Sequence, residues 1–294
     1  MNYQEFVSLI QEKVTGLLAS EINIHTYDTI RNNDSHRTGL VFSQKDINIS
    51  PAIYLEEYYM QYEDGRDADS IAENIASLYD EIKCEQSWDA RQVQEFELAR
   101  PRLVYKLIHY EKNKKLLSQL PHISFFDLAI VFYLLLDCTE KGTATIPVTN
   151  TMLEHWGICK ELLYQLAKVN TPKLLPAEYL PMHSLIHELL GEEDYEEEES
   201  YLYVLSNVQR HFGAACMLYP DILEKIGETL DCDYYLLPSS IHELIILPAS
   251  TTLTLAEINE MIVEINDSQV PKEEVLSDHT YYYSRAEAKL LSPT

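Results

Sequence analysis

The stretch Asp127–Asp137, DLAIVFYLLLD, carries the strongest structural signal in the chain. An uninterrupted apolar run, 128–136, separates its two aspartates. Both faces of a strand with this pattern are apolar, so the run predicts a strand in the middle of a sheet, covered on both sides. It is about half as long as the roughly 20 apolar residues of a membrane-spanning helix, so it predicts no span.

Candidate partner strands flank this stretch. Leu103–Tyr110 has a strand pattern and precedes it, and Thr143–Val148 follows it across a Lys141-Gly142 turn. Pro147 has no N–H to donate to a neighbouring strand, which places the second partner at an edge of the sheet.

The first hundred residues predict a helix, a three-stranded antiparallel meander and further helices. Apolar residues recur at helical spacing in 3–18, whereas Ile22–Ile30 alternates with a period of two. Asn32–Ser35 supplies turn residues, and Pro51 predicts an edge or a bulge in the third strand. The predicted elements are a helix at 3–18, strands at 22–30, 38–42 and 47–54, and helices at 55–62, 68–82 and 85–98.

Beyond the central stretch, helical and strand patterns are mixed. Together with the meander they argue for an α+β fold with mixed or antiparallel sheets and packed helices. The acidic run 191–199 has no apolar periodicity, and we expect a solvated loop between two closely associated lobes, 1–190 and 200–294. The predicted helices are 150–155, 159–169, 181–190, 220–230 and 254–265, and the predicted strands are 201–206, 213–218, 234–238, 242–248 and 280–283.

The charge balance limits the partners. The 294 residues include 48 Asp and Glu against 22 Lys and Arg, which gives a net charge of −26. Such a chain repels nucleic-acid phosphates and anionic lipid surfaces, so we expect neither direct nucleic-acid binding nor a membrane partner. The N-terminus lacks the pattern of a signal peptide, and the five scattered cysteines are odd in number, so we expect reduced thiols and a cytoplasmic location.

Motifs for known chemistry are missing from the sequence. The chain has only 8 glycines and contains none of the glycine-rich loops that bind nucleotide phosphates. It also lacks G-x-S-x-G, H-E-x-x-H and C-x-x-C. The sequence therefore predicts no cofactor and names no reaction class.

Six segments carry a family resemblance. They are 48–56, 121–129, 170–178, 212–216, 237–243 and 276–283. These segments resemble a bacterial family, domain of unknown function 5688, found chiefly in gut Firmicutes, and the C-terminal order is also similar to domain of unknown function 1444. The resemblance implies a bacterial cytosolic protein, often with mobile-element neighbours, and it implies no activity, since none is established for the family.

The segment Leu237–Glu243, LPSSIHE, combines hydroxyls, an imidazole and a carboxylate. A hydroxyl nucleophile needs a base within hydrogen-bond reach, and Ser240 and His242 would share one face of a strand. The alternative is a β-turn in which the serines cap backbone groups. A dispersed hydrolase or transferase site would draw on Ser239, Ser240, His242, Glu243, His122 and Asp127.

Two other pairs are candidates for polar chemistry. His122 with Asp127 is a possible base with its carboxylate, and a structural polar contact is the alternative. His183 and His187 lie at i and i+4, a spacing that can hold Zn²⁺, but no third ligand is near in sequence. Two solvated histidines are the alternative there, so we predict no metal.

The chain contains 21 tyrosines against 7 phenylalanines. Clusters at 58–59, 234–235 and 281–283 suit protein interfaces, although sheet packing also explains them. We therefore expect a protein–protein interaction or regulatory module that uses an acidic, Tyr-rich surface against a basic partner. The alternatives are the dispersed Ser/His/Glu enzyme and an acidic mimic of nucleic acid that acts on a DNA-binding protein.

Overall fold

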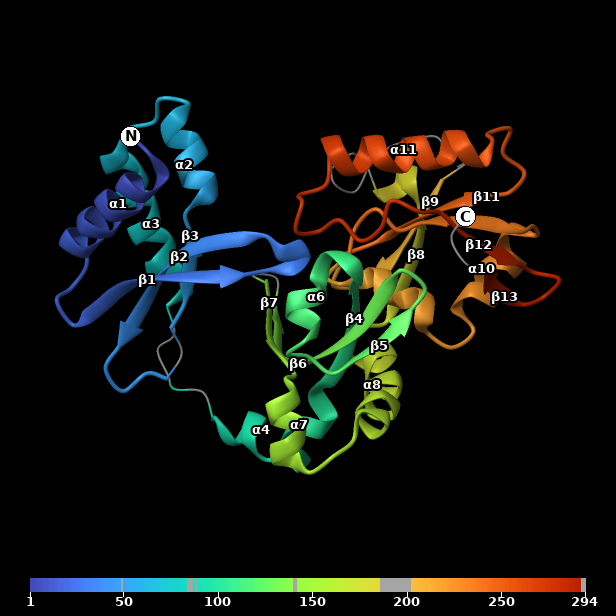
Figure 1. Cartoon of the computed structure of the whole chain (residues 1–294), viewed down its shortest axis with the longest axis horizontal. Helices are drawn as coiled ribbons and strands as arrows, with labels where there is room; N and C mark the ends of the chain where they lie inside the picture. Colours follow the sequence, from blue (N-terminus) through green and yellow to red (C-terminus); the bar gives the residue numbers. More distant parts are fainter. Residues whose placement is uncertain (49, 84–86, 88, 140–141, 186–201, 292–294) are drawn as a thin grey trace. The chain divides into compact units, whose positions relative to one another are not determined.

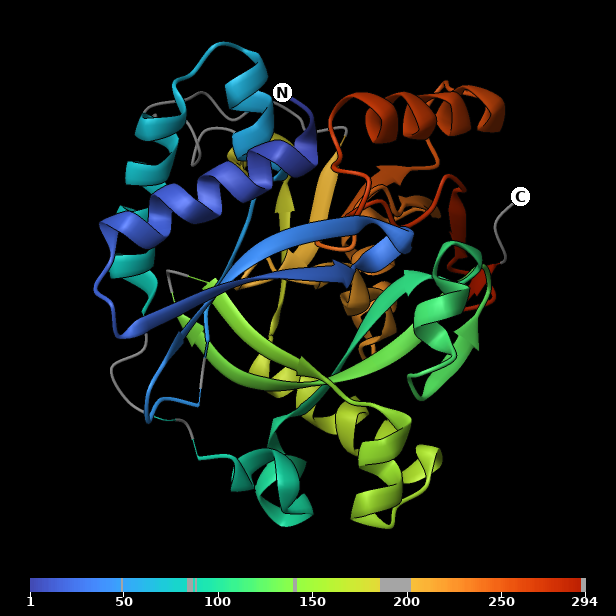
Figure 2. The same ribbon diagram turned by 60° about the vertical axis from the view of Figure 1, so that its left-hand side comes forward.

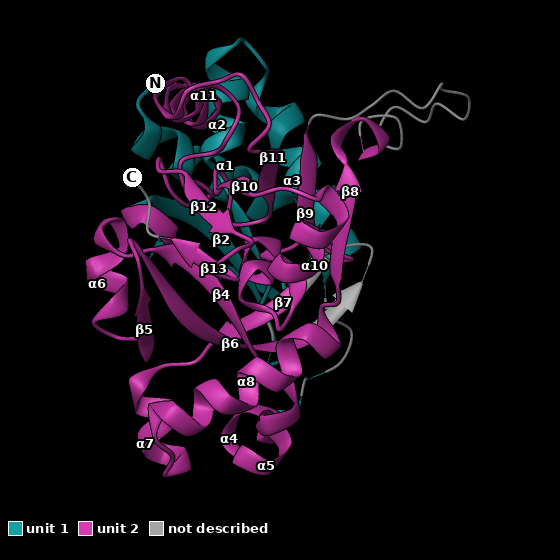
Figure 3. Cartoon of the chain, turned by 90° about the vertical axis from the view of Figure 1, so that its right-hand side faces the viewer, with its two compact units in different colours: residues 1–31, 35–90 teal, residues 32–34, 91–294 magenta. Residues whose placement is uncertain are grey.

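The computed structural model describes residues 1–294 except 49, 84–86, 88, 140–141, 186–201 and 292–294. Contacts divide the chain into two compact units (Figure 3). Unit 1 comprises Met1–Arg31 and Ser35–Ala90, and unit 2 comprises Asn32–Asp34 and Arg91–Thr294. The division therefore falls near residue 90. The boundary that the sequence predicts at 191–199 lies outside the described residues and stays a prediction.

Unit 1 is a three-stranded antiparallel sheet with helices (Figures 1 and 2). The predicted meander is confirmed, but its third strand is short. Ile47 closes a turn onto Gln44, and Pro51 has no N–H but accepts a hydrogen bond from the Phe42 N–H through its carbonyl oxygen, so pairing with β2 begins at Pro51. The elements are α1 (Tyr3–Leu17), β1 (Ile22–Ile30), β2 (His36–Gln44), β3 (Ala52–Tyr54), α2 (Glu56–Glu63) and α3 (Ala68–Ile82).

One core holds unit 1 together. Helices α1 and α3 begin at capping residues: Asn2 forms a capping box with Glu5, and Asp67 caps α3. Their apolar stripes cover one face of the sheet. The fully buried side chains there include Phe6, Ile10, Val14, Leu40, Phe42, Ile71 and Ile75.

The predicted central strand is the middle of the first sheet of unit 2. β6 (Leu128–Thr139) pairs with β4 (Leu103–His109) along one edge. β5 (His122–Phe125) and β7 (Gly142–Pro147) share its other edge, and Figure 2 shows β6 running the length of this sheet. Side chains 128–134 are at most 3% exposed, so both faces of β6 are buried, as predicted.

A second, six-stranded antiparallel sheet completes unit 2. Its order is β13-β12-β10-β11-β9-β8. Phe132 and Leu134 of β6 share a buried cluster with Leu205, Leu236 and Ile246 of this sheet, so the two sheets have a common core. The strands are β8 (Ala177–Pro181), β9 (Tyr203–Asn207), β10 (Tyr234–Leu237), β11 (Leu244–Pro248), β12 (Tyr281–Ser284) and β13 (Lys289–Leu291).

The helices of unit 2 complete the α+β fold. No described helix of either unit is long and apolar enough to cross a bilayer. The helices are α4 (Arg91–Gln94), α5 (Phe96–Ala99), α6 (Lys114–Leu117), α7 (Asn150–Trp156), α8 (Lys160–Leu174), α10 (Ile222–Leu230) and α11 (Leu255–Ser268).

Several predicted elements were wrong. The predicted strand 213–218 is a 3₁₀ helix, η4 (Gly213–Leu218), and its Gly-Ala-Ala start lacks the β-branched residues that favour strands. Helix α8 extends to Leu174 and contains Pro172, although the sequence predicts its end near residue 169. Pro181 ends β8, so the helix predicted at 181–190 begins at 182; it is helical through 185, and 186–190 lie outside the described residues.

Part of the predicted tyrosine clusters packs inside the fold. Tyr234 faces Tyr283 across β10 and β12 with stacked rings 5.0 Å apart, and both side chains are buried. Tyr281 is fully buried as well. Cross-strand packing therefore covers the rings of Tyr234, Tyr281 and Tyr283, whereas Tyr235 and Tyr282 stay half-buried, and the Tyr-rich surface stays a prediction.

We predict that Leu134→Ala lowers the free energy of unfolding of unit 2 by about 2–5 kcal/mol, because it leaves a cavity beneath the second sheet. Urea unfolding measures the loss, and amide hydrogen exchange of β4 reports unit 2 alone. Ser124→Ala, at an exposed position of β5, should change stability by less than about 0.5 kcal/mol. Equal effects of the two substitutions would contradict the central place of β6.

Candidate functional site

The segment 237–243 forms a turn before β11, which begins at Leu244 rather than at His242. Ser239 and Ser240 are buried. The Ser240 hydroxyl accepts a hydrogen bond from the backbone N–H of His242 at 3.0 Å. This contact is the turn chemistry that the sequence offers as the alternative to a nucleophile.

The imidazole of His242 has a hydrogen-bond partner at one nitrogen and a carboxylate near the other. Nδ1 accepts a hydrogen bond from the backbone N–H of Phe212 at 3.2 Å, which assigns the proton to Nε2. Nε2 lies 3.7 Å from Glu274 Oε1. Burial lowers the pKa of His242, and the nearby Lys106 lowers it further, so the ring is neutral near pH 7.

A second histidine, His211, lies beside His242. Their ring centroids are 5.2 Å apart. Burial lowers the pKa of His211 to about 4, with smaller contributions from His242 and Lys106. Sequence reasoning missed His211 and Lys106, because neither stands in a motif and only the fold brings them to His242. We call His211, His242, Lys106 and Glu274 the histidine cluster.

A strained loop holds the histidine cluster in place. Arg210 and Phe212 have positive φ angles of 49° and 56°, a conformation that side chains other than glycine adopt rarely. The Lys106 ammonium lies 4.0 Å from the centroid of the Phe212 ring, a cation–π contact. Gly213 follows at a close approach, where a Cβ would lie 2.1 Å from Ser206 Oγ and 2.5 Å from the carbonyl oxygen of His242.

Glu243 faces a different group of side chains. Burial raises its pKa, and Arg210 partly offsets that rise. Arg210 Nε also lies 3.3 Å from Glu178 Oε2. The cavity that these three residues line measures only about 10 Å³, which holds at most about one water and no substrate.

His122 and Asp127 do not form a base–carboxylate pair. His122 Nδ1 lies 3.0 Å from the carbonyl oxygen of Leu120. Asp127 accepts hydrogen bonds from the hydroxyls of Ser277 and Tyr281, both fully buried. Among the hydrogen bonds between described residues, none joins His122 to Asp127, and each makes its polar contacts elsewhere.

The predicted histidine pair is only partly described. His183 lies in the helical turn after β8, and His187 lies outside the described residues. Within the described part of the chain, no group of three or more His, Cys, Asp or Glu side chains could hold a metal ion.

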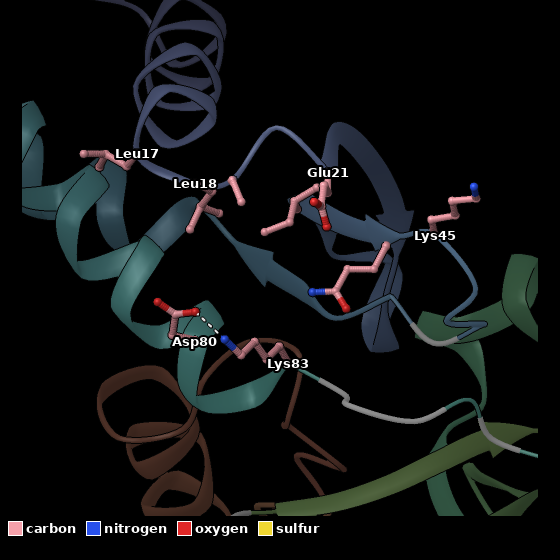
Figure 4. Close-up of a pocket in the computed structure, with 9 residues that line it drawn as sticks. Leu17, Leu18, Glu21, Lys45, Asp80 and Lys83 are labelled. Atoms are coloured by element: carbon pink, nitrogen blue, oxygen red, sulfur yellow. Dashed lines mark hydrogen bonds and ion pairs between the residues drawn. The ribbon is translucent and has the colours of Figure 1, made fainter.

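Two larger cavities lie away from these residues. One, of about 470 Å³, belongs to unit 1 and is lined by Glu21, Gln44, Lys45, Asp80 and Lys83 together with apolar side chains (Figure 4). The other, of about 510 Å³, belongs to unit 2 and is lined mainly by apolar and hydroxyl side chains around Cys232. Both volumes lie in the range of small-molecule sites.

Some of the six segments that carry the family resemblance contact one another in the structure. Segment 212–216 contacts segment 237–243 through Phe212 and His242, and Asp127 contacts segment 276–283 through Ser277 and Tyr281. A family model described as "Family of unknown function (DUF5688)" matches residues 3–285. The chain belongs to this family.

Other comparisons add nothing to the family assignment. No curated protein and no solved structure matches the chain. The resemblance of the C-terminal part to domain of unknown function 1444 stays a prediction.

We predict that Gly213→Ala lowers the free energy of unfolding by about 2–4 kcal/mol, because its methyl group overlaps Ser206 and the His242 carbonyl. Gly16→Ala is the matched control: no atom lies within 4 Å of a Cβ in helix α1, so stability should stay equal or rise by up to about 1 kcal/mol. Urea unfolding compares the two variants. A Gly213→Ala protein as stable as Gly16→Ala would contradict the close approach.

We predict a specific effect of His211 on acid stability. Its pKa is about 4 in the folded chain and about 6.5 when unfolded, so the stability it contributes is complete above pH 6.5 and is lost as pH falls toward 4. His211→Gln should therefore show a shallower loss of unfolding free energy between pH 6.5 and 4. His25→Gln, at an exposed position of β1, should keep the wild-type profile. Identical profiles for all three proteins would show that His211 is not buried as described.

Proposed function

We propose that this protein acts as a protein-binding module that uses an acidic surface of unit 1 against a basic partner. The proposal rests on residues 56–81, which contain helix α2 and most of helix α3 and which we call the acidic helix pair. Its only cation is Arg66. Its nine carboxylates are Glu56, Glu57, Glu63, Asp64, Asp67, Asp69, Glu73, Asp80 and Glu81.

The carboxylates of the acidic helix pair are accessible to a partner. All except Glu56 are exposed. Four are partly neutralised by ion pairs, with Arg37 pairing Glu56 and Glu57, Lys13 pairing Asp69, and Lys83 pairing Asp80. The surplus of negative charge attracts a basic protein at long range and selects against acidic ones.

The chemistry of unit 2 favours binding over catalysis as the function. The Ser240 hydroxyl and Nδ1 of His242 each accept a hydrogen bond from a backbone N–H of the chain itself. The cavity beside Glu243 has no room for a substrate. Within this proposal the protein works in the cytoplasm, without a cofactor and without direct contact with nucleic acid or membrane.

The test is capture of partners by the tagged full-length chain in the cells that make it, with cross-linking and identification by mass spectrometry. We expect a basic protein in stoichiometric amount, released as ionic strength rises above about 0.1 M because salt screens exposed charges. Asp64→Asn/Glu73→Gln/Glu81→Gln should weaken its binding about tenfold, equivalent to about 1.4 kcal/mol.

The matched control carries the same change of charge on another helix. Glu260→Gln/Glu264→Gln/Asp267→Asn alters three exposed carboxylates of α11 and should keep wild-type binding. A partner that both triple variants retain equally, or one that is insensitive to salt, would contradict the acidic helix pair as the contact surface.

A further inference from the structure

Strand β1 lies at one edge of the three-stranded sheet of unit 1 (Figure 1). Among the described strands it pairs with β2 alone, in a continuous register from Ile22–Gln44 to Ile30–His36 without a bulge. The outer side of an edge strand presents a row of backbone N–H and C=O groups to which another strand can pair. Proteins usually protect such edges, so the protection of each edge strand is informative.

The other edge strands of the described sheets are short, interrupted by proline or covered. Strands β3, β5 and β13 have three, four and three residues. Strands β7 and β8 end at Pro147 and Pro181, which lack an N–H. Along β4, the hydroxyl of Thr171 in α8 accepts a hydrogen bond from the Tyr105 N–H. In contrast, β1 has nine residues and contains neither proline nor lysine.

The hydrogen-bond pattern identifies the residues of β1 that face the open edge. In β2 the even-numbered residues bond to the β3 side, as the Phe42 N–H does to the carbonyl oxygen of Pro51. The odd-numbered residues of β2 therefore bond to β1, and the register pairs them with odd-numbered residues there. Consequently the N–H and C=O groups of Thr26 and Asp28 point away from the sheet, and both residues are exposed.

Only the first part of this edge is occupied by the chain itself. Gln11 of α1 donates from Nε2 to the carbonyl oxygen of Ile24 at 3.0 Å. The open part is therefore 26–30. It also carries exposed apolar surface, since Tyr27 is 52% and Ile30 is 42% exposed. A strand added here would gain backbone hydrogen bonds and would cover part of that surface.

The one formal charge on the open part of β1 is the carboxylate of Asp28. It accepts a hydrogen bond from the Thr38 hydroxyl at 2.7 Å. The neighbouring Arg37 pairs with Glu56 and Glu57 instead. Like charges directly opposite each other destabilise a pair of strands, whereas opposite charges stabilise it. Asp28 therefore selects against an acidic strand and favours one that places a lysine or arginine opposite it.

The charge of unit 1 as a whole decides between a second copy and a different protein. Its two segments, 1–31 and 35–90, contain 16 Asp and Glu against 6 Lys and Arg, a net charge of −10. A second copy would bring an equal negative charge to the same edge. A basic segment is attracted to it instead.

We propose that the open part of β1 binds an extended basic segment of a partner protein as an added antiparallel strand. Its backbone pairs with the N–H and C=O groups of Thr26 and Asp28. A basic side chain lies beside Asp28, and an apolar side chain lies beside Tyr27 on the opposite face. The proposal rests on the basic partner proposed above and adds the way in which that partner is held.

A peptide of four Lys-Val repeats, added to the full chain, tests the proposal. Fluorescence anisotropy measures its binding, and amide hydrogen exchange followed by NMR locates it. Exchange of the Thr26 and Asp28 N–H groups should slow about tenfold or more at saturating peptide, whereas the Tyr27 N–H already bonds to β2 and should change less. Absence of binding, or binding that leaves the exchange of Thr26 and Asp28 unchanged, would overturn the proposal.

Two N-methylated peptides of identical charge separate strand pairing from simple attraction. Methylation of the lysine amides removes the donors that face Thr26 and Asp28 and should weaken binding about tenfold or more. Methylation of the valine amides, which point away from β1, should leave binding unchanged within about twofold. Equal binding of the two peptides would contradict an added strand.

Variants of β1 test the same contact from the protein side. Thr26→Pro removes an outward N–H and no hydrogen bond to β2, so it should keep the fold and weaken peptide binding about tenfold. If proline destabilises β1, Asp28→Lys gives a second test. It should weaken binding of the Lys-Val peptide about tenfold and strengthen binding of a Glu-Val peptide. Glu260→Lys, at an exposed position of α11, makes the same charge change and should alter neither. An unchanged preference in Asp28→Lys would overturn the proposal.

Failure of this proposal can be distinguished from failure of the proposed function. A basic partner that the triple variant of the acidic helix pair weakens and Thr26→Pro retains would overturn strand addition alone. Strand pairing by the Lys-Val peptide without any basic partner in cells would overturn the proposed function and keep β1 as a strand-binding edge. A dimer in sedimentation that Thr26→Pro dissociates would make a second copy the occupant and overturn the basic segment.

Discussion

The burial of β6 on both faces is the constraint on which unit 2 depends. One face of β6 packs with the six-stranded sheet through Phe132 and Leu134. The opposite face packs through Val131 on Leu117 and Leu120. Both edges of β6 are also paired, and its side chains 128–134 are buried, so this part of the strand has neither a free face nor a free edge. An apolar run of this kind specifies a place in the fold as well as a secondary structure.

Sequence patterns were sufficient where one element's periodicity is local and strong. The meander of unit 1, the helices α1 and α3 and the central strand β6 were all predicted, because alternation and helical spacing report a buried face directly. The segment 213–218 was mispredicted because an apolar run of six residues fits a strand or a buried 3₁₀ helix equally well. The close approach at Gly213 decides between them, and it depends on Ser206 and His242, which are distant in sequence.

The histidine cluster shows what sequence reasoning could and could not supply. His242 was singled out from its neighbours in the chain. His211 lies on a loop with two positive φ angles and Lys106 lies on β4, so only the fold brings these two residues to His242. Backbone strain of this kind persists when surrounding contacts over-determine it, and here the Phe212 N–H, the Phe212 ring and Gly213 are all engaged. No local sequence pattern predicts a loop of this kind. The cavity of unit 1 was missed for the same reason, since its lining comes from four separate elements.

The topology of the two units also sets an order of events during synthesis. Unit 1 is built from residues up to 90, so its sheet can form while the rest of the chain is still on the ribosome. Unit 2 cannot complete its folding before the C-terminal part is synthesised. Strand β10 lies between β11 and β12, and the hydrogen-bond partners of Asp127, Ser277 and Tyr281, are about 150 residues later in the chain. Until those residues emerge, the apolar surface of β6 lacks its final cover. The nascent chain is therefore most prone to aggregation late in translation, between a finished N-terminal unit and an incomplete second one.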